Sequence, residues 1–211
     1  DLCGECYVCV IVEVFRLVRE LLADDGTLWL NMGDCYTSTS GSGQCAKPQH
    51  TRGTSTWEGA IRGISSGLKP KDLVGMPWRI AFALQADGWY LRSDIIWAKP
   101  NPMPESVTDR PTKSHEYLFL LTKSPRYFMD MEAIREPHSE KDYRQSRIVK
   151  DKQRGDARIW DTRSDFDECN PAGRNRRTVW AISTEAYSEA HFATFPRKLG
   201  EPCILAGTSV M

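Results

Sequence analysis

A short polar segment, Asn31 to Asp34, directly follows the apolar run Leu28–Leu30. A continuous apolar run of this length is typical of a strand that is buried on both faces of a sheet. The residues before it have helical periodicity and end in a turn signal, so helix, turn, strand and polar loop follow one another as in an α/β sheet. Ligands of such sheets bind beyond the carboxyl ends of the strands. We therefore expect Asn31, Gly33 and Asp34 to lie at a ligand site.

A second candidate segment for ligand binding is AHFATFPRKLGEPCILAG, residues 190–207. Pro196 is suited to the start of a helix, because the first helical position does not need a backbone N–H. Taken alone, the residues before it also have an ordinary structural explanation. Phe192 and Phe195 can pack as hydrophobic side chains, and Thr194 can cap the helix.

Three cysteines near the start, Cys3, Cys6 and Cys9, have the spacing C-x2-C-x2-C. This spacing resembles part of an iron–sulfur ligand run, which needs a fourth cysteine nearby. The next cysteine is Cys35, beyond the predicted helix and strand. We therefore expect no metal ion here and interpret the segment as a chain end that leads into a helix.

Two segments show helical patterns. In residues 7–26 apolar side chains recur every three or four positions and form one apolar face, and the Asp-Asp-Gly at the end signals a stop. In residues 75–90 Pro77 suits the helix start and Gly88 the left-handed position after its end. The apolar positions expected to face the core are Val8, Ile11, Phe15, Val18 and Leu22 in the first helix, and Ile80, Ala81 and Leu84 in the second.

Strands and loops alternate with these helices. Residues 89–99 and 116–123 are predicted strands, and the proline-rich segment between them is predicted to be a stiff loop. Residues 37–68 are rich in Ser, Thr and Gly and predict a long flexible loop. Residues 178–184 are expected to form a strand or an extended arm.

Residues 135–177 differ in character from the rest of the chain. From Lys141 to Arg177 there are eleven Lys and Arg against seven Asp and Glu, with little apolar periodicity. A run of charge alone is often a solvated surface. The alternative is an insert that faces nucleic acid, in which basic side chains neutralise phosphates.

The whole-chain composition fits one soluble globular domain: of 211 residues, 40% are hydrophobic and 27% charged. The 28 basic residues balance the 28 acidic ones, so any affinity for nucleic acid has to come from local charge. No apolar run approaches the roughly 20 residues of a membrane span, and the start has no basic leader. The odd, scattered cysteines do not suggest a disulfide framework, so we expect no membrane partner and a cytoplasmic location.

The order of three long segments is more specific than any of these features. GTLWLNMGDCY, DIIWAKPNPMPESVTDRPTKSHEYLFLLTKS and HFATFPRKL together resemble the β-group DNA amino-methyltransferases, which methylate N4 of cytosine or N6 of adenine. The resemblance covers most of the chain outside residues 37–68 and 139–173. It implies an α/β, Rossmann-like class I methyltransferase sheet, present in part, with a basic target-recognition insert. It also implies S-adenosylmethionine as cofactor, double-stranded DNA as substrate and a bacterial or phage restriction-modification context, and it is compatible with a homodimer.

The resemblance divides the chain and assigns candidate residues. Residues 1–134 would be the first part of the catalytic domain, 135–177 the target-recognition insert and 178–211 the return to the catalytic domain. It implies that the cofactor lies against Asn31, Gly33, Asp34, His191, Phe192, Thr194, Phe195 and Pro196. The candidates for base or DNA contact are Trp97, Lys99, Asn101, Arg110, His115, Glu116, Arg144, Arg147, Arg174, Arg176 and Arg177.

Some of these residues have structural alternatives. His115 can be a satisfied structural histidine. Arg110 and Glu116 can form a surface ion pair across the loop, which would contribute little stability. Trp180 can belong to the core. Most of the arginines of the insert would contact phosphate, which orients the protein without reading sequence.

The family's two most diagnostic motifs are not found in this chain. The catalytic Asp/Ser/Asn-Pro-Pro-aromatic tetrapeptide would come before the first helix, and the chain contains no Pro-Pro pair. The Gly-rich cofactor turn would come after the last helix. We therefore expect a fragment, or a chain with unrecorded ends, and no measurable cofactor binding by these 211 residues alone.

Two alternatives stay open beside a methyltransferase of a flipped base. The first is a DNA-binding remnant without catalysis. The second is a small-molecule methyltransferase on the same fold, which would leave the basic insert unexplained. Between the two exocyclic amines the resemblance favours N4 of cytosine over N6 of adenine.

Overall fold

The computed structural model describes residues 6–37, 68–138, 170–186 and 194–208. The chain divides into two compact units, which are described separately. The first unit comprises Asp1–Phe128 and Thr178–Gly200, and the second comprises Met129–Arg177 and Glu201–Met211. The flexible loop expected at residues 37–68 lies almost entirely outside the described residues.

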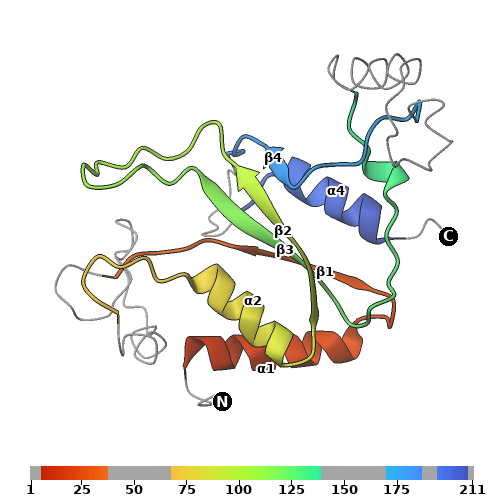
Figure 1. Cartoon of the computed structure of the whole chain (residues 1–211), viewed down its shortest axis with the longest axis horizontal. Helices are drawn as coiled ribbons and strands as arrows, with labels where there is room; N and C mark the ends of the chain where they lie inside the picture. Colours follow the sequence, from red (N-terminus) through yellow and green to blue (C-terminus); the bar gives the residue numbers. More distant parts are fainter. Residues whose placement is uncertain (1–5, 38–67, 139–169, 187–193, 209–211) are drawn as a thin grey trace, which may run out of the picture. The chain divides into compact units, whose positions relative to one another are not determined.

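The first unit is built on a four-stranded sheet (Figure 1). Its strands are β1 (Thr27–Met32), β2 (Tyr90–Ala98), β3 (His115–Thr122) and β4 (Val179–Ala181), in the order β1-β3-β2-β4. β3 runs antiparallel to both of its neighbours, whereas β2 and β4 are parallel. The carboxyl ends of β1, β2 and β4 and the start of β3 therefore lie at the same end of the sheet. We call this end, where the strands stop and the loops begin, the rim.

Two helices, α1 (Tyr7–Leu21) and α2 (Met76–Ala86), pack on one face of this sheet (Figure 1). The second helix was predicted closely: Ile80, Ala81 and Leu84 are completely buried, and Gly88 follows the helix with a φ of 100°. In α1 the predicted apolar face also contacts the core, but its most buried member is Val12, which the sequence analysis did not select.

β1 differs from its prediction. The strand was expected to be buried on both faces, yet all six of its residues are only half-buried. The reason is its position, since within the described sheet β1 pairs with β3 alone and is an edge strand. The Trp29 ring lies with its centroid 6.3 Å from that of Trp180, which is buried as a core residue.

The second unit contains a short 3-10 helix, η2 (Glu132–Ile134), and an isolated antiparallel bridge between Glu136 and Arg174. It also contains most of α4 (Arg197–Gly207), which begins directly after Pro196 and ends at Gly207 as predicted. The backbone N–H of Asp130 donates to the carbonyl of Ala206 over 2.9 Å.

Cysteine usage differs in part from expectation. Cys35 is disulfide-bonded, which the scattered cysteine positions had not suggested. Nowhere in the described ranges is a helix both long enough and apolar enough to span a membrane.

Candidate functional site at the rim of the sheet

An ion pair joins β2 to β3 at the rim. The Lys99 ammonium, directly after β2, donates to Oε1 of Glu116, near the start of β3. It also lies 4.3 Å from the centroid of the Trp97 ring, where a cation–π attraction adds to the ion pair. The Lys99 and Glu116 side chains are only 19% and 25% exposed, so solvent screens the pair weakly.

Gly33 lies beside the same carboxylate. A Cβ atom placed on Gly33 would be 3.8 Å from Cδ of Glu116, so the end of β1 approaches the start of β3 at ordinary contact distance. The alternative pairing of Arg110 with Glu116 is wrong, because Glu116 binds Lys99 and Arg110 binds Glu105 over 2.7 Å.

Asp34 organises the helix that follows rather than pointing freely into the site. Its Oδ1 accepts the backbone N–H of Cys35 over 2.9 Å and that of Met76 over 3.0 Å. Met76 is the first residue of α2, so the carboxylate satisfies one of the helix N–H groups that have no partner within the helix. Asn31 is similarly engaged, since its amide donates to the carbonyl of Tyr117 over 3.1 Å.

Lys113 brings a further positive charge to the rim. Its ammonium lies 4.0 Å from Oδ2 of Asp34, and its side chain is only 17% exposed. Burial lowers the pKa of Lys113 because desolvation penalises the charged form, and the carboxylates of Asp34 and Glu116 offset part of that effect. This cation is largely removed from water, and its nearest carboxylate is at the limit of ion-pair distance.

Two hydrogen-bonded pairs tie β2 and its loop to the segment after β4. Trp97, which is almost fully buried, donates its indole N–H to the carbonyl of Ile182 over 2.7 Å. Asn101 and Thr184 form a two-way pair. The side-chain amide of Asn101 donates to the Thr184 hydroxyl, and the Thr184 backbone N–H donates to the side-chain oxygen Oδ1 of Asn101, both over 3.0 Å.

The predicted cofactor wall is described only in part. Thr194 and Phe195 are exposed and Pro196 is buried, whereas His191 and Phe192 lie outside the described residues. The backbone N–H of Arg197 donates to Oε2 of Glu185 over 3.3 Å, which connects the start of α4 to the segment after β4.

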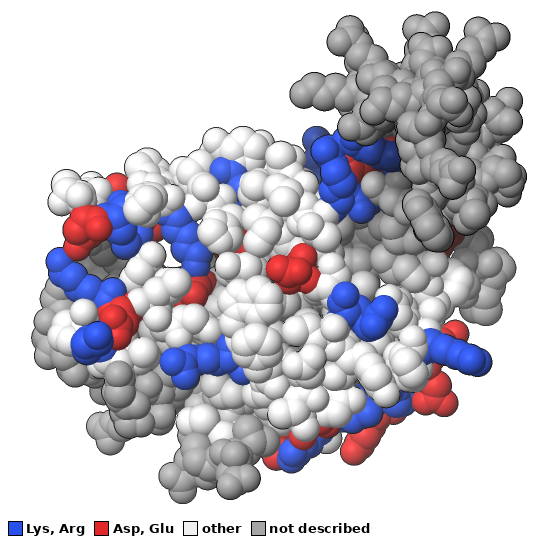
Figure 2. All heavy atoms as spheres, viewed as in Figure 1, with Lys and Arg blue, Asp and Glu red and all other residues white. Residues whose placement is uncertain are grey.

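The loop between β2 and β3 carries mixed charge. Arg110 lies with its guanidinium 3.9 Å from the centroid of the Tyr36 ring, and the hydrogen bond to Glu105 raises the pKa of Arg110. Lys71 pairs with Asp109 over 2.8 Å. Figure 2 shows acidic and basic side chains side by side over this loop. The His115 ring packs edge-on against Tyr117, with the centroids 5.4 Å apart, a contact that fits the structural alternative for this residue.

In the second unit Arg174 and Arg177 are bound to one acidic side chain, that of Glu136. Oε2 of Glu136 accepts from the guanidinium groups of Arg174 and Arg177, at 3.2 and 3.1 Å. Arg176 is half-buried, and Arg144 and Arg147 lie outside the described residues.

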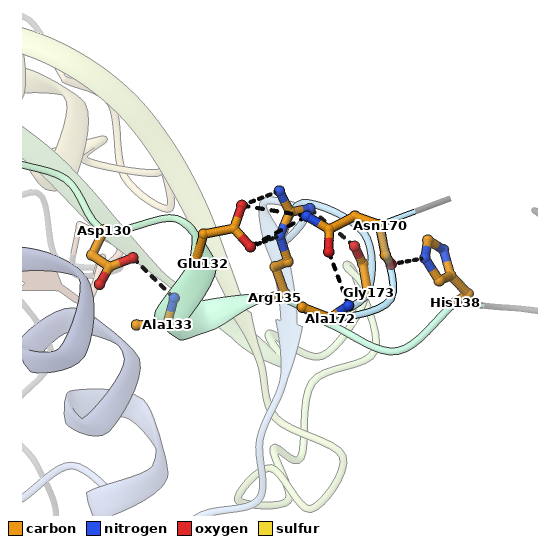
Figure 3. A network of polar contacts seen from close by, with 8 residues as sticks. All are labelled: Asp130, Glu132, Ala133, Arg135, His138, Asn170, Ala172 and Gly173. Atoms are coloured by element: carbon orange, nitrogen blue, oxygen red, sulfur yellow. Dashed lines mark hydrogen bonds and ion pairs between the residues drawn. The ribbon is translucent and has the colours of Figure 1, made fainter. Parts of the chain in front are cut away.

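A neighbouring network of polar contacts joins two segments of this unit, residues 130–138 and 170–173 (Figure 3). Arg135 pairs with Glu132 and donates to the carbonyl of Gly173 over 2.9 Å. Asn170 contacts Glu132 through its amide and His138 through its carbonyl oxygen. The residues that flank 139–169 are therefore held together by polar contacts.

A family model described as DNA methylase matches residues 4–210 of the chain. The chain belongs to this DNA methylase family. It is 47% identical over 202 residues to the type II methyltransferase M.SmaI of Serratia marcescens, and the match covers 96% of the chain and 59% of that relative. It is 49% identical over 199 residues to the type II methyltransferase M.Cfr9I of Citrobacter freundii, and the match covers 94% of the chain and 55% of that relative.

The fold of the chain is similar to that of a solved structure, the cytosine-N4-specific PvuII DNA methyltransferase. The TM-score is 0.54 at 14% sequence identity, over 96% of this chain and 55% of that one. This likeness confirms the expected class I methyltransferase fold. The chain spans somewhat more than half the length of each of these three proteins.

Two residues at the rim were not selected from the sequence. Lys113 lies on the loop between Arg110 and His115, which were both selected, and this position could have indicated it. Thr184 carries no such signal, because its partner Asn101 lies 83 residues earlier in the chain.

Proposed function

We propose that this chain forms part of a DNA methyltransferase that transfers a methyl group from S-adenosylmethionine to the exocyclic amine of a base flipped out of duplex DNA. The base favoured is cytosine, at N4, on the strength of the sequence resemblance. The observation that carries the proposal is the meeting of Gly33, the Lys99–Glu116 pair and the Asn101–Thr184 pair at one edge of a methyltransferase sheet.

The rim is suited to the cofactor in two respects. Gly33 presents no side chain at the end of β1, and a ligand can therefore approach the backbone closely there. Lys113 supplies a half-buried positive charge close to the same strand end, which suits an anionic group such as the carboxylate of the methionine moiety. Asn31 and Asp34 would act by fixing the strand end and α2, since their side-chain atoms already bind the protein backbone.

S-adenosylmethionine would supply an electrophilic methyl group on sulfur. The exocyclic amine of a base is a weak nucleophile because its lone pair is delocalised into the ring. Catalysis of this transfer therefore depends mainly on holding amine and methyl in line. The part assigned to this chain is to position the cofactor and the loop 99–114 that would border the base.

DNA contact is proposed at the rim loop and in the second unit. Among the residues selected for DNA contact, Arg177 has a side chain that is 67% exposed while it binds Glu136, so it can reach a phosphate without unfolding. Arg174 is more enclosed, at 23%, and its main role is to hold the second unit together.

The test is to express the whole gene that contains the coding sequence of this chain in a host without DNA methylation, digest the host DNA to nucleosides and identify modified bases by mass spectrometry. N4-methylcytosine is expected. N6-methyladenine in its place would refute the choice of base but keep the enzyme class.

A Lys113→Met variant serves as a site control in the same assay, with Lys71→Met, an exposed lysine, as its matched comparison. We expect Lys113→Met alone to reduce methylation. If the unaltered gene yields no methylated base although the protein is folded and abundant, the catalytic proposal is wrong and the DNA-binding alternative takes its place. Binding to a short duplex, measured over a range of salt concentrations, would then distinguish that alternative from loss of all function.

A further inference from the structure

The loop that joins β2 to β3 carries a largely uncovered apolar side chain at the rim. Met103 is 84% exposed, whereas methionine is ordinarily among the residues that proteins bury. Figure 1 shows this loop, residues 99–114, extending beyond the ends of both strands. A single exposed apolar residue is common on protein surfaces and by itself indicates nothing. What distinguishes Met103 is how the backbone on either side of it is held.

Prolines restrain this backbone. In the segment KPNPMP, residues 99–104, every second residue is a proline. Each proline has its φ fixed at about −65°, and the residue before a proline is restricted to extended conformations. Met103 lies between Pro102 and Pro104 and is therefore restricted in both ways by its neighbours. Such a segment has little conformational entropy left to lose on binding, so the contacts it makes are offset only weakly by ordering.

Side-chain contacts anchor the loop two residues before Met103 and two residues after it. Asn101 is bound to Thr184 by two hydrogen bonds, and Glu105 accepts from the guanidinium of Arg110 over 2.7 Å. Met103 is thus the apolar tip of a segment that is held on both sides.

The charge of the loop allows it to approach DNA. Every carboxylate in residues 99–116 is paired with a cation: Glu105 with Arg110, Asp109 with Lys71 and Glu116 with Lys99. Lys113 adds a further positive charge. The loop therefore presents no unneutralised carboxylate of its own to a phosphate backbone.

We propose that Met103 enters the DNA helix and fills the space that the target base leaves when it is flipped out, an inference that rests on the methyltransferase function proposed above. Flipping costs the stacking and pairing of that base. Apolar side chains, methionine among them, can insert between base steps as wedges. The unbranched thioether side chain adapts to a space of irregular shape. Met103 would thus stabilise the flipped state by replacing part of the lost stacking.

The experiment uses the enzyme expressed from the whole gene and a short duplex that contains the methylation site mapped in host DNA. A second duplex is identical except that its target nucleotide is abasic. Kd is measured by fluorescence anisotropy with S-adenosylhomocysteine present, which has no methyl group to transfer. Met103→Ala removes the wedge, and Met103→Leu keeps an apolar side chain of similar size. Ser106→Ala is the matched control, because Ser106 is exposed on the same loop.

We expect Met103→Ala to raise Kd at least about tenfold for both duplexes, because the vacant space inside the helix is present in each. Met103→Leu and Ser106→Ala should stay within about threefold of the unaltered enzyme. Methionine carries no charge, so Met103→Ala should leave the dependence of Kd on salt concentration unchanged. Thermal unfolding should also be unchanged, since the side chain is exposed.

Three results would overturn this inference while leaving the methyltransferase proposal intact. The first is that Met103→Ala binds both duplexes as tightly as the unaltered enzyme. The second is a loss confined to the duplex with an intact target base, which would mean that Met103 stacks on the flipped base instead. The third is an altered salt dependence, which would mean that phosphate contacts were lost.

A failure of the methyltransferase proposal would look different. The unaltered enzyme would then methylate no DNA, and the role assigned to Met103 would be refuted together with that function.

Discussion

At the scale of single residues, Gly33 is a glycine that the protein's own structure does not require. Its Cβ position is at ordinary contact distance from Glu116, 3.8 Å or more, and its φ is not in the left-handed region. Neither packing nor conformation therefore demands glycine here. The reason that we propose is room for a ligand at the rim.

We predict that Gly33→Ala changes the free energy of unfolding by less than about 0.5 kcal/mol but reduces methyl transfer. Urea unfolding and the nucleoside assay measure the two effects separately. Gly173→Ala is the contrasting substitution, because φ there is 112° and a Cβ would lie 2.3 Å from the carbonyl oxygen of Glu136. It should destabilise the protein clearly, and a Gly33→Ala variant that does the same would remove the argument for a ligand space.

The Asn101–Thr184 pair allows a second residue-scale prediction. Because each partner satisfies the other, Asn101→Ala and Thr184→Val should each lower stability by about 1 kcal/mol, and the double variant should lose less than the sum. A double-mutant cycle in urea measures this coupling. Strictly additive losses would show that the bond from the Asn101 amide to the Thr184 hydroxyl does not form in solution, since Thr184→Val leaves the backbone N–H in place.

At the scale of elements, the carboxylate of Glu136 connects two segments of the second unit, because it binds Arg174 and Arg177. Burial by itself would raise the pKa of Glu136, but the hydrogen bonds from the backbone and guanidinium of Arg177 and from Arg174 outweigh burial and lower it. A glutamate whose pKa is lowered in the folded state stabilises that state above its unfolded pKa. This stabilisation is lost as the pH falls through the folded pKa.

We therefore predict that the bridge between Glu136 and Arg174 opens in acid, below the ordinary glutamate pKa of about 4.3. The backbone N–H of Arg177 donates to Oε1 of Glu136 over 2.5 Å, so its amide signal in NMR reports the titration. Glu136→Gln should remove this transition and cost about 1 to 3 kcal/mol at pH 7. A midpoint at or above the ordinary value would contradict the prediction.

The elements also show which features local sequence encodes. The buried positions of α2 could be predicted because helical periodicity and its proline and glycine signals lie within one short segment. The half-burial of β1 and the antiparallel direction of β3 could not, since both depend on which strands become neighbours. Arg174 and Arg177 were selected for DNA contact because the sequence does not show their partner Glu136, which lies 38 residues before Arg174.

At the scale of the whole molecule, sequence resemblance was more informative than any local pattern. It identified the family and fold correctly, because long motifs record a three-dimensional arrangement that periodicity cannot express. The specific roles of rim residues stay predictions. Geometry adds that several selected residues, among them Asp34, Asn31 and Asn101, already bind other parts of the protein.

The order of the strands has a consequence for how the first unit opens. β3 is bonded on both sides along its length, whereas β4 joins the sheet through only three residue pairs. In deuterated solvent the amides of β3 should therefore exchange last and those of β4 among the first. Each brief detachment of β4 would also separate Thr184 from Asn101, so the proposed site would lose this contact long before the sheet itself unfolds.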